Sequence, residues 1–185
     1  MALSKIVLTI DLGGPRRLDI HENNEVIITD RCSKKCVFFT GPRWKRFVGM
    51  IADIDEHVQL VSAGVGTQYR QPIGGTWFVS VNNTFPTVDI RHWYSKTSIW
   101  VSLKPTAVGI AFTYPNWNKL KNAAIRVENE IPAMSAISPC LHDSHIEQMI
   151  CDECSPYCNP EVTSENSSTS DNDVAHWRSG YWTVF

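Results

Sequence analysis

The chain has 185 residues, 43% of them hydrophobic, which is enough to bury the core of one or two small domains. The net charge of −2 is unevenly spread: residues 1–135 carry 16 Lys and Arg against 11 Asp and Glu, and residues 136–185 carry one against eight. This pattern predicts a polyanion-binding body whose acidic tail competes for the same surface, although a solvated globule with a disordered acidic end fits the same charges.

The first strands are expected at residues 5–10, 17–21, 25–29 and 36–40, where β-branched and aromatic residues lie between turns. A single helix is expected from Pro42 to Val58, because proline suits the first helical position and Trp44, Phe47 and Ile54 recur at helical spacing. Residues 62–66 are small and indicate a linker. Strands that precede a helix, rather than alternate with helices, predict an α+β fold with an antiparallel sheet.

The second half of the chain repeats the first. Residues 36–58 align without a gap with residues 109–131, so that Phe39, Thr40, Pro42 and Trp44 fall on Phe112, Thr113, Pro115 and Trp117, each 73 positions later. Further strands are expected at 75–81, 88–93, 99–103 and 109–113, with a turn at 104–108, and residues 18–20 match residues 88–90 at an offset of 70. Two copies predict a duplicated unit that packs against itself.

We therefore predict two tandem units, at 1–61 and 67–135, each a four-stranded antiparallel curved sheet followed by a helix. They are expected to pack as an intrachain pseudo-dimer, with the apolar stripes of the two helices buried against each other. The alternative is that each helix covers only its own sheet. Trp44 and Trp117 lie on these stripes and are expected to be packing residues.

The second unit carries a spaced pattern that resembles a known family. An aromatic-Val-Ser-Val run at 78–81 is followed by Asp-Ile-Arg with aromatics at 89–94, Lys-Pro at 104–105, Gly-Ile-Ala at 109–111 and Pro-x-Trp-x-x-Leu at 115–120. This order resembles the single-stranded-DNA-binding domain of the transcriptional coactivator family called positive cofactor four. The resemblance implies paired helices, adjacent sheet grooves that hold melted or single-stranded DNA, and a nuclear role in transcription, coactivator-like, or in replication.

A protein that binds single strands without sequence preference needs cationic side chains for the phosphates and aromatic rings on which the bases stack. The predicted nucleic-acid-binding residues are Arg16, Arg17, Lys34, Lys35, Arg70, Trp77, Phe85, Arg91, Trp93 and Lys104. The resemblance matches the arginine of the family's Asp-Ile-Arg motif to Arg91 in the second unit and to His21 in the first. It also implies two unequal grooves, of which the second is richer in aromatic residues. Trp77 and Phe78 alternate, so that one of the two must be buried.

The chain after the second unit is rich in thiol and imidazole groups. Six of them fall within 19 residues: Cys140, His142, His145, Cys151, Cys154 and Cys158. Because Cys-x2-Cys is a spacing typical of zinc sites, we predict a structural zinc segment at 138–160, held by Cys151 and Cys154 with two of the other four. Reduced, unconnected cysteines are the alternative.

Residues 161–185 form a polar acidic stretch, expected to be disordered, with an aromatic tip that by analogy recruits transcription or replication proteins. There is no apolar run long enough to span a membrane and no signal-like N-terminus, so an intracellular location is expected. Phosphate loops, nucleophile motifs and HExxH are missing from the sequence, and we expect no enzyme activity. The competing hypothesis is a protein-interaction scaffold or coactivator module with weak nucleic-acid contact.

Overall fold

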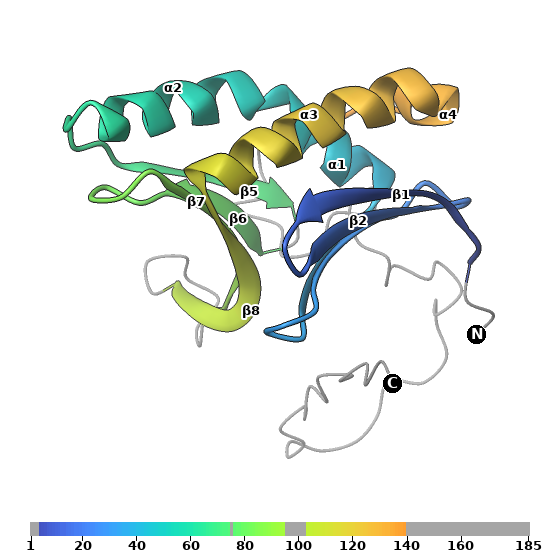
Figure 1. Ribbon diagram of the computed structural model, residues 1–185, viewed down its shortest axis with the longest axis horizontal. Helices are drawn as coiled ribbons and strands as arrows, with labels where there is room; N and C mark the ends of the chain where they lie inside the picture. The colour runs from blue at the N-terminus through green and yellow to red at the C-terminus, as the bar shows by residue number, and fades with distance from the viewer. Residues whose placement is uncertain (1–3, 75, 95–102, 140–185) are drawn as a thin grey trace, which may run out of the picture.

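The computed structural model describes residues 4–74, 76–94 and 103–139 (Figure 1). It confirms an α+β fold of two four-stranded antiparallel sheets, each followed by helices. The first unit comprises β1 (Ile6–Gly13), β2 (Arg16–His21), β3 (Val26–Asp30), β4 (Lys35–Phe39), α1 (Gly41–Gly49) and α2 (Ile51–Ser62). The second comprises β5 (Tyr69–Gly74), β6 (Trp77–Val81), β7 (Thr87–Tyr94), β8 (Lys104–Thr113), α3 (Tyr114–Glu130) and α4 (Pro132–Ser135).

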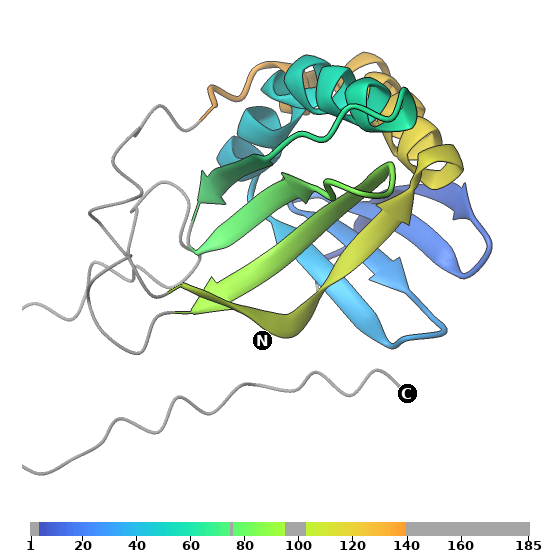
Figure 2. The ribbon, with the colours of Figure 1, turned by 90° about the vertical axis from the view of Figure 1, so that its left-hand side faces the viewer.

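Each sheet has one apolar face, which the helices cover (Figures 1 and 2). In the first sheet Leu18, Ile20, Ile28, Val37 and Phe39 are fully buried, and they occupy alternate positions along their strands. Because successive side chains of a strand point to opposite faces, the residues between them form the other, helix-free face. Of the two faces of each sheet, this is the one that the helices leave uncovered.

The first unit's helical segment is divided into α1 and α2, which corrects the expectation of one helix. Pro42 stands in the first turn of α1, as expected from its fixed φ. The division falls at Met50, whose N–H donates to the carbonyl of Phe47, three residues back, after the poor helix former Gly49. The corresponding helix α3 is continuous over 17 residues. None of the helices in the described ranges is long and apolar enough to cross a membrane.

The helices pack across the two units. Helix α1 contacts β5 of the second sheet, where Arg46 Nε donates to the carbonyl of Pro72 at 3.1 Å, and α2 lies over β6 and β7. Helix α3 in turn packs against β1 as well as against its own β7 and β8. The alternative in which each helix covers only its own sheet is therefore wrong. The two sheets also lie against each other along β4 and β8, so that each unit completes the core of the other.

The helices also contact one another, as predicted. The rings of Phe47 and Trp117 lie 6.3 Å apart, and both side chains are fully buried, as is Trp44. Two ion pairs join the units: Asp55 with Lys121, at 2.6 Å, and Glu128 with Lys45.

A groove between α1–α2 and α3 shows that the 73-residue offset is a pseudo-two-fold relation in space. Its volume is about 540 Å³. One side is lined by Val48, Ile51 and Ala52, and the other by Lys121, Ala124 and Ile125, their counterparts 73 positions later. The acids of the two ion pairs, Asp55 and Glu128, obey the same offset.

The strand registers show which strands correspond. Gly13 pairs with Arg16 as Gly74 pairs with Trp77, and Val26 pairs with Phe39 as Val88 pairs with Phe112. The number of positions between a residue of the first unit and its counterpart in the second is therefore 61 in β1 and β2, 62 in β3, and 73 from β4 onward. One of the added residues of the second unit lies between β6 and β7, and the other eleven lie between Arg91 of β7 and Gly109 of β8.

This correspondence corrects three expectations. Residues 18–20 lie in β2, the second strand of the first sheet, but residues 88–90 lie in β7, the third strand of the second sheet, so the expected match at an offset of 70 is wrong. For the same reason Thr29, and not His21, corresponds to Arg91. The first strand of the second unit is β5, which we had not predicted, because Pro72 and Gly74 interrupt its strand pattern. The expected turn at 104–108 is part of β8. The expected strand at 99–103 falls almost wholly outside the described residues.

Candidate nucleic-acid interface

The helix-free face of the second sheet carries a stack of one cation and two rings. The guanidinium of Arg70 lies over the ring of Trp93, 4.8 Å from its centroid, and the Trp93 ring meets Phe78 at 5.9 Å, edge to face. Phe78 is buried beneath this stack, whereas Arg70 is exposed. Cation–π contact therefore holds a planar, charged group in a defined place at the surface.

Phe85 stands apart from this stack, in the turn between β6 and β7. The side-chain oxygen of Asn82 accepts hydrogen bonds from the backbone N–H of Thr84 and of Phe85, at 2.8 and 3.0 Å. This Asx-type turn orders the backbone, and the Phe85 side chain is 66% exposed. An exposed phenyl ring on an ordered turn is a ready surface for stacking.

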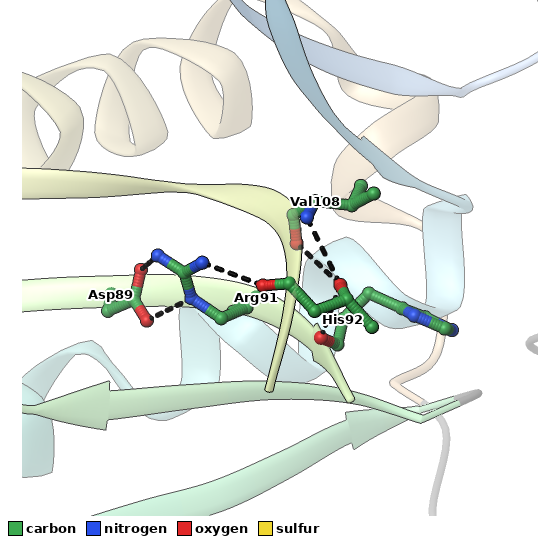
Figure 3. Close-up of polar contacts among 5 residues, drawn as sticks. Asp89, Arg91, His92 and Val108 are labelled. Atoms are coloured by element: carbon green, nitrogen blue, oxygen red, sulfur yellow. Dashed lines mark hydrogen bonds and ion pairs between the residues drawn. The ribbon is translucent and has the colours of Figure 1, made fainter. Parts of the chain in front are cut away.

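Arg91 forms an ion pair with Asp89, two residues away on the same strand (Figure 3). Its Nε and Nη2 donate to the two carboxylate oxygens of Asp89, at 2.7 and 3.0 Å, and Nη1 donates to the carbonyl of Thr106 at 2.8 Å. The bonds to Asp89 raise the pKa of the guanidinium further above its usual value. The Thr106 hydroxyl donates to the carbonyl of His92 at 2.8 Å and accepts from the N–H of Val108, so Arg91 and Thr106 together fasten β8 to β7.

Trp77 points to the opposite, helix-covered face. It shares this face with Val79 and Val81, packs against the core, and meets His92 edge to face at 5.6 Å. Burial, with the nearby charge of Arg43, lowers the pKa of His92. Of the two adjacent aromatics, Phe78 is thus the one on the helix-free face, and Trp77 supports the sheet from behind.

In the first sheet both predicted arginines are paired with acids. Arg16 Nε lies 3.2 Å from Asp30, and its guanidinium sits over the ring of Phe112 in β8, at 5.3 Å. Arg17 Nε lies 2.7 Å from the carboxylate of Asp19, which is 3% exposed. Arg16 thus links the two sheets, Arg17 is paired within its own strand, and a phosphate would have to compete with a carboxylate for either of them.

The turn between β3 and β4 presents the remaining charges of the first unit. Asp30 accepts hydrogen bonds from the N–H of Cys32 and of Ser33, at 3.0 and 3.1 Å, which orders the turn. Burial would raise the pKa of Asp30, but the hydrogen bonds from Ser33 and Arg16 outweigh it and keep that pKa below its usual 3.8. Lys34 is exposed and Lys35 half-buried, and within the described residues neither forms an ion pair.

Lys104, at the start of β8, is also exposed. The structure adds two residues that we had not predicted as site residues, namely Phe78 and the exposed Arg31 beside Lys34. Strand alternation was the signal for Phe78, and the basic turn 31–35 was the signal for Arg31.

The six predicted zinc ligands, Cys140, His142, His145, Cys151, Cys154 and Cys158, all lie outside the described residues. Among the residues that the structure does describe, no three His, Cys, Asp or Glu side chains gather as a metal site would require.

Comparisons with known proteins return no relative. No family model matches the chain, and neither a curated protein nor a solved structure is similar to it at the significance required.

Proposed function

We propose that the protein binds single-stranded DNA, without catalysing a reaction, on the helix-free faces of its two sheets. The observation that carries this proposal is the Arg70 guanidinium held over Trp93, above the buried ring of Phe78. An arginine plane fixed in this way offers a charge to a phosphate and a flat surface to a base. Phe85 offers a second surface of the same kind.

Single strands fit these groups better than duplex DNA does. In a duplex the faces of the bases are stacked on one another, so exposed rings gain nothing from them, whereas an unpaired base can stack on Phe85 or on Arg70. The exposed Lys34 and Lys104 and the half-buried Lys35 supply charge for the backbone. Arg16, Arg17 and Arg91 are instead assigned to internal ion pairs. The resemblance to positive cofactor four supports the same function, and a nuclear role in transcription or replication rests on that resemblance alone.

The test is a titration of labelled 30-nucleotide dT and of a 30-base-pair duplex at two salt concentrations. We expect the single strand to bind more tightly, and its log K to fall linearly with log salt by about 0.7 per phosphate neutralised. Phe85→Ala should weaken binding of dT by about tenfold, since stacking is worth about 1–3 kcal/mol per base. The matched control is Tyr114→Ala, which removes a 40% exposed ring from the helix layer.

Equal affinity for single strand and duplex, or a loss with Tyr114→Ala as large as that with Phe85→Ala, would contradict the proposal. Either result would favour the competing hypothesis of a protein-interaction scaffold with weak nucleic-acid contact.

A further inference from the structure

We propose that the two sheets divide the work: bases bind on the second sheet alone, and the first sheet holds phosphates of the same strand. This inference rests on the proposed function. It comes from comparing corresponding positions of the two helix-free faces, which the strand registers identify without reference to any other protein.

Where the second sheet carries its stack, the first sheet carries an ion pair whose carboxylate also accepts a hydrogen bond. Thr9 corresponds to Arg70 and Arg17 to Phe78, each 61 positions earlier. The Thr9 hydroxyl donates to Asp19 at 2.7 Å, and Arg17 Nε lies 2.7 Å from the other oxygen of the same carboxylate.

Arg17 is held in place by Asp19, and drawing it away to meet a bound strand would break this ion pair. Because Asp19 is 3% exposed, its carboxylate would then be left buried with its charge unbalanced, which is strongly unfavourable. At the position where the second sheet carries the ring of Phe78, the first sheet therefore offers no ring, and its arginine stays with Asp19.

The turns show the same division. The turn after β2, which corresponds to the turn of Phe85, carries the acids Glu22 and Glu25 and would repel a phosphate. The basic turn after β3 carries Arg31, Lys34 and Lys35, whereas the positions 73 residues after the two lysines are the uncharged Ala107 and Val108. Rings are thus concentrated on the second sheet and turn cations on the first.

The turn cations of the first sheet and the Arg70–Trp93 stack of the second are placed where one strand could meet both. The sheets lie against each other along β4 and β8, and both views show the hairpin end of β3 and β4 and the bent start of β8 on the side away from the helices (Figures 1 and 2). The cations of the first unit thus lie on the same side of the molecule as the start of β8, which pairs with Trp93 of the stack.

The experiment uses the full chain with two probes: 20-nucleotide dT and an abasic 20-mer that has the same sugar-phosphate backbone without bases. Phe85→Ala should weaken dT binding by about tenfold and change abasic binding by less than about twofold. Lys34→Ala/Lys35→Ala should weaken both probes alike and reduce the salt slope by about 1.4, because each phosphate contact with a single strand contributes about 0.7.

The control is Phe38→Leu, which removes a half-buried ring from the helix-free face of the first sheet while keeping its apolar bulk. It should change binding of either probe by less than about twofold. Three results would overturn the division. Phe38→Leu could weaken dT binding as much as Phe85→Ala does, or the double lysine variant could leave binding of the abasic probe unchanged. The third is that the wild-type protein binds both probes with equal affinity. Wild-type protein that binds neither probe would instead refute the proposed function itself.

Discussion

Asp55 of α2 is the residue whose replacement tests the joined pseudo-dimer most directly. Its carboxylate accepts a hydrogen bond from Trp117 Nε1 at 3.0 Å and another from Lys121 Nζ at 2.6 Å, both on α3. A third comes from Gln59 at 3.1 Å, on its own helix. Two of these three bonds therefore join the first unit to the second.

The cost of Asp55→Ala follows from these contacts. A hydrogen bond to a charged group contributes about 1.5–3 kcal/mol, and Trp117 is fully buried, so its N–H would be left without a partner. The Asp55 and Lys121 side chains are 23% and 22% exposed, so water replaces part of the ion pair. We expect Asp55→Ala to lower the free energy of unfolding by about 2–3 kcal/mol, and Asp55→Asn, which keeps an acceptor for Trp117, by about 1 kcal/mol.

Urea unfolding at pH 7 measures this loss, as a lower midpoint with an unchanged slope. Glu56→Ala, one position along the same helix and exposed, is the matched control and should stay within about 0.5 kcal/mol of wild type. If Asp55→Ala costs no more than this control, the network does not join the units and the reasoning is wrong.

The same network predicts a pH dependence. Burial alone would raise the pKa of Asp55, but the bonds from Lys121 and Trp117 outweigh it and hold the pKa below its usual 3.8. The folded protein therefore binds this proton more weakly than the unfolded chain does, so the stabilisation is complete above about pH 4 and is lost as the pH falls through the lowered pKa. The stability difference between wild type and Asp55→Asn should shrink below pH 4, and a difference that persists at pH 2 would contradict this account.

Three further outcomes are expected. Gly109→Ala should destabilise the fold by about 2 kcal/mol, because the added Cβ would lie 2.6 Å from a carbonyl oxygen of β7. Gly49→Ala, in open space at the end of α1, should be neutral or stabilising by up to about 1 kcal/mol. Denaturant unfolding of the two variants measures both changes. Burial, aided by a nearby aspartate, raises the pKa of Tyr69 to about 12, so Tyr69→Phe should remove the latest tyrosinate transition in an alkaline absorbance titration. If the cysteine-rich segment holds zinc, Cys151→Ser/Cys154→Ser should abolish the metal that a chromophoric chelator releases from purified protein, and wild type without metal would refute that prediction.

Part of the candidate interface follows from local spacing along single strands. Residues two apart on a strand share a face, so their spacing is enough to predict that Asp89 can pair with Arg91, and Arg17 with Asp19. Arg70 and Trp93 are different: they lie on β5 and β7, with β6 between them, and only the folded sheet brings the guanidinium over the ring.

By itself the sequence determined the class of the fold, the repeat around Trp44 and Trp117, and the buried stripe of each helix. These are local properties, because periodicity decides which side of an element is apolar. Tertiary structure alone decided what each apolar side packs against: α2 covers the second sheet and α3 reaches β1 of the first. The physical reason is that burial is satisfied by any complementary apolar surface, and the choice among such surfaces depends on how the whole chain is connected in space.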